Sequence, residues 1–326
     1  MGTVTTAPRR PAALIAMRPE VAELALPADL RRRLGEFCDL TDTRSEADLL
    51  ITGWGCPVVD AALLAGAPRL RAVLHAAGSV KQLLAPEVWA RGITVSSAAA
   101  ANAVPVADYT LSAIRLAAKR AFRLAGDYRA GQPQDLTVSP HTGLVARTVG
   151  VVGASRTGRL VLERLAATGV RTVVHDPYLP PGEAAALGAE PLALDALLSR
   201  SDIVTLHAPL LPATRHLLDA RTLALLPDGA VLINTARGGL VDTRALTEHC
   251  ASGRIDAVLD VTDPEPLPPG HPLLALPNVL VTPHIAGAMG TEVRLLGEFA
   301  VEEARRFVAG EALLGEVRAE DLPRIA

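Results

Sequence analysis

The sequence predicts an α/β protein with two doubly wound parallel sheets and a cleft between the two domains. Its 326 residues exceed what a single hydrophobic core usually organises. Short apolar or β-branched runs alternate with longer stretches rich in Ala, Leu and Arg, which is typical of parallel α/β sheets. The alternation stops near residue 125 and resumes near residue 147, so we expect two domains rather than one.

The first series of strands is predicted at ALIAM, DLLIT, LRAVLHA and ITVSS, which cover residues 13–17, 48–52, 70–76 and 93–97. A continuous apolar period over about 104–124 then predicts one long helix, with Asn102 near its start and Gly126 after its end. The Gly-, Pro- and polar-rich segment over about 126–146 is expected to be an extended loop.

The second series of strands is predicted at RTVGVVG, VRTVVHD, DIVTLHA, AVLINTA, IDAVLDV and NVLVTPH, and it ends near residue 285. It indicates a second, fuller parallel sheet. A helical period from about 290 to 310 is expected to return the chain to the first unit. We therefore predict a discontinuous first domain over 1–103 plus 291–326, and a second domain over 104–290.

The composition narrows the class of protein. With 49% hydrophobic residues and 21% charged residues, the chain has enough apolar surface for large cores and is not disordered by composition. Thirty-two basic against 35 acidic residues give a net charge of only -3, and no long basic run is present. This balance argues against nucleic acid as a partner.

The cysteines and the apolar runs indicate the compartment. Cys38, Cys56 and Cys250 are odd in number and widely spaced, which fits neither a disulfide framework nor a zinc site. The apolar run PAALIAM is too short for a secretion signal and lacks a small-residue cleavage site. No stretch reaches the roughly 18 uninterrupted apolar residues of a membrane span. We expect a soluble cytoplasmic protein, with no membrane partner and no metal.

The most specific local signal is the glycine-rich turn in TVGVVGASRTGRLVLERL. An apolar strand runs into a turn, and a helix follows directly; the turn contains Gly153, Ser155, Arg156, Thr157 and Gly158. In dinucleotide-binding folds the first glycine permits the tight turn and the last lets helix and strand pack closely. Ser155 replaces the middle glycine, and its hydroxyl is able to donate to a phosphate oxygen. The alternative is an ordinary turn between a strand and a helix.

An acidic residue follows the next strand at a suitable distance. Asp176 ends RTVVHD, 18 residues after Gly158, close to the spacing at which an acid receives the hydroxyls of the adenosine ribose. A carboxylate there repels a 2′-phosphate, so the cofactor is expected to be NAD rather than NADP, unless Arg156 or Arg159 turns toward it. The alternative is an aspartate that caps the turn before Pro177.

Polar residues also follow three later strands, where an open α/β sheet places its ligands. Arg237 lies between the strand of INTARGG and two glycines, and an arginine there is able to bind a carboxylate through two hydrogen bonds. Asp260 ends a strand and Glu265 follows between two prolines, which hold its direction. His284 follows Pro283 and is able to exchange a proton near neutral pH. Taken singly, each also fits a surface or structural role.

In three consecutive blocks the sequence resembles the D-isomer-specific 2-hydroxyacid dehydrogenase family. The blocks are TVGVVGASRTGRLV closing at HDPY, LHAPLLPATRHLLDARTLALLPDGAVLINTARGGLVD, and DAVLDVTDPEPLPPGHPLLALPNVLVTPHIAG, within residues 148–290. The resemblance implies two domains of the Rossmann/flavodoxin-like type. The first binds substrate, and the second is an NAD-binding Rossmann domain. It also implies a homodimer, with contributions from the long helix and from the loop over residues 126–146.

The resemblance assigns roles to these positions. Arg237 would bind the substrate carboxylate, His284 would be the general acid/base, and Glu265 would orient His284 and favour its charged form. Hydride would pass between the nicotinamide of NAD and a 2-hydroxy acid/2-keto acid pair. The nicotinamide side of the cofactor would be lined by residues that follow the later strands, namely His207, Ala208, Pro209, Thr235, Ala236, Asp260 and His284.

The first domain resembles the family less. Members acting on phosphorylated substrates tend to carry an arginine after the DLLI-type strand, whereas this chain has Trp54 between two glycines. The loop with Gly78 and Ser79 is expected to receive the substrate carboxylate through its backbone amides. Lys81 either contacts a second acidic group of the substrate or is a solvated loop lysine. Which 2-hydroxy acid is used is left open.

Three other functions are weighed against the dehydrogenase. A non-catalytic NAD-sensing binding protein of the corepressor type shares this fold and is able to retain the triad, but we expect no appended interaction tail. A formate-dehydrogenase-like enzyme would carry a neutral partner in place of Glu265. A methyltransferase with the same turn would not need Arg237 and His284.

Overall fold

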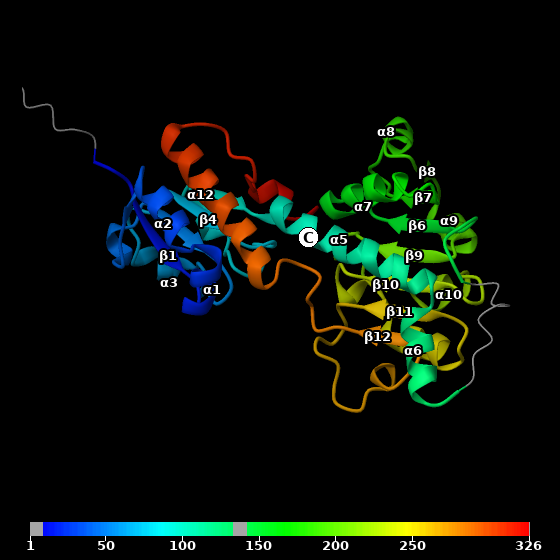
Figure 1. The fold of residues 1–326 in the computed structure, drawn as a ribbon. Coiled ribbons are helices and arrows are strands. Elements are labelled where there is room, and N and C mark those ends of the chain that lie inside the picture. The colour runs from blue at the N-terminus through cyan, green and yellow to red at the C-terminus, as the bar shows by residue number, and fades with distance from the viewer. Residues whose placement is uncertain (1–8, 133–141, 326) are drawn as a thin grey trace, which may run out of the picture. The chain divides into compact units, whose positions relative to one another are not determined.

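The computed structural model describes residues 9–132 and 142–325, and the chain divides into two compact units (Figure 1). Unit 1 contains the chain up to Asn102 together with Ala288–Ile325, and unit 2 contains Ala103–Gly287. Each unit has its own sheet, and every strand pair in both sheets is parallel. The predicted class of two parallel α/β sheets is therefore confirmed, whereas the cleft between the domains stays a prediction.

Unit 1 contains a five-stranded sheet in the order β2-β1-β3-β4-β5. Four of its strands lie within the runs predicted from sequence or overlap them closely, and the two-residue β2 was not predicted because it is short and exposed. The strands are β1 Ala12–Ala16, β2 Asp39–Leu40, β3 Leu49–Thr52, β4 Ala72–His75 and β5 Thr94–Ser97. The helices are α1 Pro19–Ala25, α2 Ala28–Gly35, α3 Ala61–Ala65, α4 Glu87–Ala90 and α12 Val293–Ala309.

Unit 2 contains a seven-stranded sheet in the order β12-β11-β10-β9-β6-β7-β8. The strands are β6 Thr148–Val152, β7 Arg171–His175, β8 Glu190–Pro191, β9 Ile203–Leu206, β10 Val231–Asn234, β11 Asp256–Leu259 and β12 Val279–Val281. The helices are α5 Ala99–Ala118, which starts in unit 1, α6 Ala121–Arg129, α7 Arg156–Ala166, α8 Pro181–Ala186, α9 Leu194–Arg200, α10 Ala220–Ala224 and α11 Thr243–Ala251. Six of these strands correspond to the predicted runs.

The central strands of this sheet are apolar because helices cover both of its faces. All residues of β6, β9, β10 and β11 are buried. Helix α7 buries one of its faces. The buried residues recur at the spacing of a helix face, and they are Gly158, Val161, Leu162 and Leu165. The sheet and its helices therefore form a rigid base for the residues at the strand ends.

The single long helix predicted over about 104–124 is wrong. The structure has two helices, because Arg120 adopts a left-handed conformation with φ 50° and interrupts the period between α5 and α6. Its side chain explains the interruption: Nη1 donates to Asp256 Oδ2 at 3.0 Å and Nη2 to the Gly229 carbonyl at 2.7 Å. Gly126 lies inside α6 instead of after a helix, and Asn102 lies inside α5. Much of the predicted loop, residues 133–141, lies outside the described residues.

The ion pair at this interruption is buried, so its loss is expected to lower stability. Burial raises the pKa of Asp256, and the charges of Arg120 and Arg123 oppose that effect. We predict that Arg120→Ala lowers the free energy of unfolding by about 3 kcal/mol, because a buried carboxylate loses its main partner. Urea denaturation measures the change. Arg123→Ala is the matched control: it removes a longer 3.5 Å contact and is expected to cost less than about 1 kcal/mol. Equal losses in both variants would contradict this account.

Candidate active site

The site in unit 2 is built where the strand order reverses. Strand β6 lies between β7 and β9, so the connections leave it in opposite directions at their carboxyl ends. The glycine-rich turn follows β6, and His207 with Ala208 follows β9. A Cβ at Gly153, whose φ is +95°, would lie 2.4 Å from the Ala208 backbone nitrogen. Only glycine fits this position, because the two chain segments touch at the reversal.

The turn leads directly into helix α7, and its backbone is shaped to receive an anion. A Cβ at Gly158 would lie 2.0 Å from the Gly153 carbonyl oxygen, so the helix begins in close contact with the turn. Ser155 is the N-cap, and its Oγ accepts from the Gly158 nitrogen at 3.3 Å. Its hydroxyl hydrogen is still able to serve a phosphate oxygen. The close glycine contacts and the free amides at the start of an 11-residue helix fit the pyrophosphate of a dinucleotide.

Asp176 lies beside this turn at the end of β7. Its Oδ2 accepts from the Ala154 nitrogen at 2.7 Å, and its Oδ1 accepts from the Tyr178 nitrogen at 2.8 Å. The carboxylate therefore caps the turn before Tyr178 and also connects β7 to the glycine-rich turn. It is half-buried, so its remaining lone pairs are open to a hydroxyl donor. Arg159, one of the two arginines considered for a 2′-phosphate, instead forms an ion pair with Glu183.

His284 and Glu265 meet at the other end of the same sheet edge. The distance between His284 Nδ1 and Glu265 Oε1 is 2.6 Å, and both side chains remain partly exposed, at 52% and 43%. A carboxylate only accepts, so Nδ1 is the donor and Nε2 is the ring nitrogen left for exchange with another molecule. Prolines flank Glu265 on both sides and hold its direction.

A buried carboxylate holds the turn that carries His284. Asp260 is 1% exposed; its Oδ1 accepts from Thr282 Oγ1 at 2.6 Å and from the Ile285 nitrogen at 2.8 Å. Its Oδ2 accepts from the Ala286 nitrogen at 2.9 Å, and its carbonyl accepts from the His284 nitrogen at 2.9 Å. The backbone of His284 has φ 56°, a conformation that a non-glycine residue adopts only when its surroundings impose it. The hydrogen bonds of Asp260 impose it.

Arg237 follows β10 and is held by its neighbour Asn234. The Asn234 side chain donates to the Arg237 carbonyl at 2.9 Å and accepts from the Ala236 nitrogen at 3.1 Å. Burial lowers the pKa of Arg237, and the charge of Glu265 opposes this effect, which brings these two site residues into one electrostatic group. A guanidinium remains charged under these conditions. Arg237 Nη1 donates to the Ala236 carbonyl at 2.7 Å, and this hydrogen bond orients the guanidinium group of Arg237.

Two further side-chain hydrogen bonds lie at the same edge of the sheet. His207 Nε2 lies 2.9 Å from Thr205 Oγ1, and burial lowers the pKa of His207 to about 3, so the imidazole is neutral. Thr235 Oγ1 lies 2.9 Å from Thr110 Oγ1 on α5. Ala208 is buried and Pro209 is half-buried beside them. Sequence reasoning missed the roles of Asn234 and Thr282. Both residues lie within the quoted blocks, but their roles depend on hydrogen bonds that only the fold reveals.

The predicted substrate residues of unit 1 lie at the carboxyl edge of its own sheet. Trp54 follows β3 and is 38% exposed, and Gly78 and Ser79 follow β4. His75, which was not predicted, anchors this edge: its Nδ1 lies 2.9 Å from Thr52 Oγ1. Burial lowers the pKa of His75 to about 4, and a backbone hydrogen bond of Ser79 opposes the shift. The ends of β3 and β4 are thus joined at the point where the chain continues into the Gly78–Ser79 loop.

Within residues 9–132 and 142–325, no group of three or more His, Cys, Asp and Glu side chains is arranged to hold a metal ion. All three cysteines are free thiols, and burial raises the pKa of each. No helix among the described residues is long and apolar enough to cross a membrane.

These features together define a dinucleotide-binding α/β protein with an acid-base pair at the carboxyl edge of its sheet. The family model of the D-isomer specific 2-hydroxyacid dehydrogenase NAD binding domain matches residues 111–286. The chain therefore belongs to the D-isomer specific 2-hydroxyacid dehydrogenase family, and the cofactor of its unit 2 is a nicotinamide dinucleotide. The resemblance found in the sequence is confirmed.

Individual relatives support the same membership. A D-3-phosphoglycerate dehydrogenase of Mycobacterium tuberculosis is 38% identical over 267 residues, which cover 82% of this chain and 50% of that protein. An (S)-sulfolactate dehydrogenase of Chromohalobacter salexigens is 33% identical over 298 residues, 88% of this chain and 96% of that one. The chain spans about half the length of the phosphoglycerate dehydrogenases that it matches.

Among solved structures, the chain is similar to a D-isomer specific 2-hydroxyacid dehydrogenase of Xanthobacter autotrophicus Py2, determined in complex with NADPH and MES. The two are 28% identical with a TM-score of 0.75, and the match covers 95% of this chain and 98% of that one. The likeness therefore extends over both units.

The role of Asp260 in holding the His284 turn is directly testable. We predict that Asp260→Asn accelerates amide hydrogen exchange at Ile285 and Ala286, because the amide side chain has one acceptor oxygen where the carboxylate has two. The free energy of unfolding should fall by about 2 kcal/mol. The matched control is Asp263→Asn, which affects an exposed pair with Arg215 and should change stability by less than about 0.5 kcal/mol. Unchanged exchange at 285 and 286 would contradict this role.

Proposed function

We propose that the protein is an NAD-dependent D-2-hydroxyacid dehydrogenase, which interconverts a 2-keto acid and the corresponding D-2-hydroxy acid. The observation that carries the proposal is the 2.6 Å contact between His284 and Glu265, on the same sheet edge as Arg237 and the glycine-rich turn. A dinucleotide-binding fold alone would not require an oriented acid-base pair or a guanidinium there. The relatives named as dehydrogenases and the family model that matches residues 111–286 also support the proposal.

The residues of unit 2 have distinct tasks in this reaction. When bound, the nicotinamide supplies the hydride for reduction of the keto acid and accepts it in the reverse direction. Arg237 binds the substrate carboxylate and stabilises the negative charge that develops on the carbonyl oxygen. His284 gives a proton from Nε2 to that oxygen during reduction, and takes it back during oxidation. Glu265 keeps Nδ1 protonated, which fixes the direction of the ring.

The cofactor is held by backbone more than by side chains. The amides of the Gly153–Gly158 turn would receive the pyrophosphate, with the Ser155 hydroxyl as a further donor. Asp176 would accept from the ribose hydroxyls and disfavour the 2′-phosphate of NADP. His207, Ala208, Pro209, Thr235, Ala236 and Asp260 would lie along the nicotinamide side.

In unit 1, the amides of Gly78 and Ser79 would receive the substrate carboxylate, and Trp54 would contact the rest of the substrate. We further propose that the protein works as a homodimer in a reducing cytoplasm, where its three free thiols are stable. The domain roles follow the same division, with substrate on unit 1 and NAD on unit 2.

The proposal is tested by NADH oxidation in the presence of small, branched, aromatic and dicarboxylic 2-keto acids. We predict turnover with at least one of these acids and a loss of at least about 100-fold in His284→Ala, because the proton donor is removed. Binding of NADH, measured by fluorescence, should stay within about two-fold. His271→Ala is the matched control and should retain full activity. Tight NADH binding without turnover on any acid would favour the NAD-sensing binding protein and contradict the dehydrogenase.

Cofactor choice is tested at Asp176. The variant Asp176→Asn keeps the size of the side chain and removes its charge. We predict that its affinity for NADH falls about ten-fold, since a charge-assisted hydrogen bond to the ribose is weakened. Its affinity for NADPH relative to NADH should rise, which isothermal titration measures. A wild-type protein that already prefers NADPH would contradict the role given to Asp176.

A further inference from the structure

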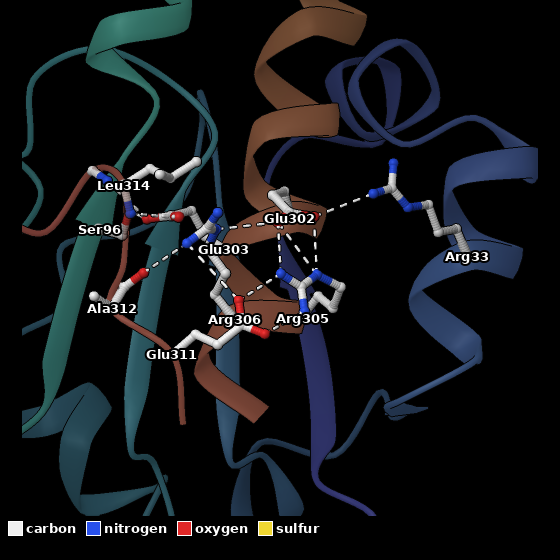
Figure 2. Close-up of polar contacts among 10 residues, drawn as sticks. Arg33, Ser96, Glu302, Glu303, Arg305, Arg306, Glu311, Ala312 and Leu314 are labelled. Atoms are coloured by element: carbon white, nitrogen blue, oxygen red, sulfur yellow. Dashed lines mark hydrogen bonds and ion pairs between the residues drawn. The ribbon is translucent and has the colours of Figure 1, made fainter. Parts of the chain in front are cut away.

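The C-terminal segment, residues 311–325, is fixed to unit 1 by a buried carboxylate on α12. Glu303 is 1% exposed, and its oxygens accept from the Leu314 and Gly315 nitrogens, each at 2.9 Å, and from Ser96 Oγ. Figure 2 shows Glu303 directed toward Ser96 and Leu314. One side chain thus joins the helix, strand β5 and the start of the segment.

A second group of charges joins α12 to Arg33 of α2 and to the residues after α12 (Figure 2). Glu302 accepts from Arg305 at 2.9 Å and from Arg306 at 3.1 Å, and it also pairs with Arg33 at 3.3 Å. Arg306 in addition donates to the Ala312 carbonyl at 3.1 Å, so the first residues after the helix are held from both sides. These pairs are partly open to solvent and individually weak, whereas Glu303 is fully buried and is the main anchor.

Beyond the anchor, the segment pairs with the edge of the sheet in unit 1. The Ser97 nitrogen donates to the Gly315 carbonyl at 2.9 Å, and the Val317 nitrogen donates to the Val95 carbonyl at 2.9 Å. A Cβ at Gly315 would lie 2.4 Å from the Ser97 carbonyl oxygen, so a glycine is needed for this approach. Trp89 Nε1 donates to the Val317 carbonyl at 3.1 Å. The segment covers the otherwise open edge of β5.

The end of the segment reaches the loop that follows β4. Lys81 Nζ donates to the Ile325 carbonyl. Leu322 and Ile325 also pack against the same hydrophobic cluster that contains Val80 and Leu83, on either side of Lys81. The segment therefore contacts this loop through the hydrogen bond of the charged Lys81 and through shared apolar burial. The proposed carboxylate-binding residues Gly78 and Ser79 lie three and two residues before Lys81, respectively.

We propose that the C-terminal segment positions the 78–81 loop for substrate, and that Lys81 is the positioning residue that joins them. The inference rests on the proposed function, in which the amides of Gly78 and Ser79 receive the substrate carboxylate. Amide donors bind an anion well only if the loop is held in place before the substrate arrives, since ordering the loop on binding costs affinity. Lys81 thereby acts on substrate indirectly, instead of contacting a second acidic group of the substrate.

The chain is well suited to a direct test, because Lys81 and Lys119 are its only lysines. In the chain that extends to residue 326 we expect Lys81 to be acetylated by an amine reagent at least about five-fold more slowly than the exposed Lys119, as followed by mass spectrometry. A chain that ends at Val317 keeps the Glu303 anchor and the pairing with β5 but lacks the Ile325 carbonyl that accepts from Lys81. There the rate of Lys81 should rise toward that of Lys119. Equal rates in the chain that extends to residue 326, or protection of Lys81 that survives truncation at Val317, would overturn the contact.

The consequence for substrate is tested by kinetics with Lys81→Met, the chain ending at Val317, and the combination of both changes. We expect KM for the 2-keto acid to rise about ten-fold in all three, with kcat within about three-fold, because a positioned binding loop is lost but the chemistry in unit 2 is not. Lys119→Met is the matched control and should match the wild type. Leu322→Ala should raise KM in the same direction if the truncated chain does not fold.

The outcomes separate this inference from the proposed function. A loss in Lys81→Met that is confined to dicarboxylic acids, or effects of the two changes that multiply, would overturn the positioning role and favour a direct contact. Unchanged KM in both single variants, with normal wild-type turnover, would overturn the inference alone. A wild-type protein that binds NADH and reduces no keto acid would instead overturn the proposed function.

Discussion

The parallel direction of all strands in unit 2 is the constraint on which its site depends. Because every strand ends at the same edge, residues far apart in the chain, such as Gly153 and His284, reach one edge of the sheet without any long loop. The reversal between β6 and β9 then opens that edge for a ligand, and glycines at 153 and 158 allow the backbone to close around it. The residues proposed to bind the cofactor and to transfer the proton therefore all follow the carboxyl ends of strands in this sheet.

The site at this sheet edge depends on polar side chains that hold the proposed functional residues in place. The buried carboxylate of Asp260 imposes the left-handed backbone of His284, and Glu265 fixes the ring by its bond to Nδ1. Asn234 does similar work for Arg237. Asp260 and Asn234 thus hold the backbone of His284 and Arg237, and Glu265 orients the His284 ring, so the site is shaped before substrate arrives.

Features that depend on neighbouring residues could be predicted from the sequence, whereas features that depend on contacts between distant residues could not. Strands and the glycine-rich turn were predictable because apolar runs and a turn before a helix are local patterns. The interruption between α5 and α6 at Arg120 was not predictable, because we attribute it to contacts such as the ion pair with Asp256, 136 residues away in the chain. The sequence likewise did not predict the contributions of Asn234 and Thr282 or the contact of Lys81 with Ile325. Each depends on which segments the fold brings together.

The central claim is that hydride passes from the nicotinamide to the 2-carbon of a keto acid, with His284 as the proton donor. The most direct measurement is isotope transfer: the protein is incubated with NADH deuterated at the transferring position and the best 2-keto acid, and the product is analysed by mass spectrometry and chiral chromatography. The account predicts a D-2-hydroxy acid that carries deuterium at its 2-carbon. A product without deuterium, or one of the opposite hand, would contradict it.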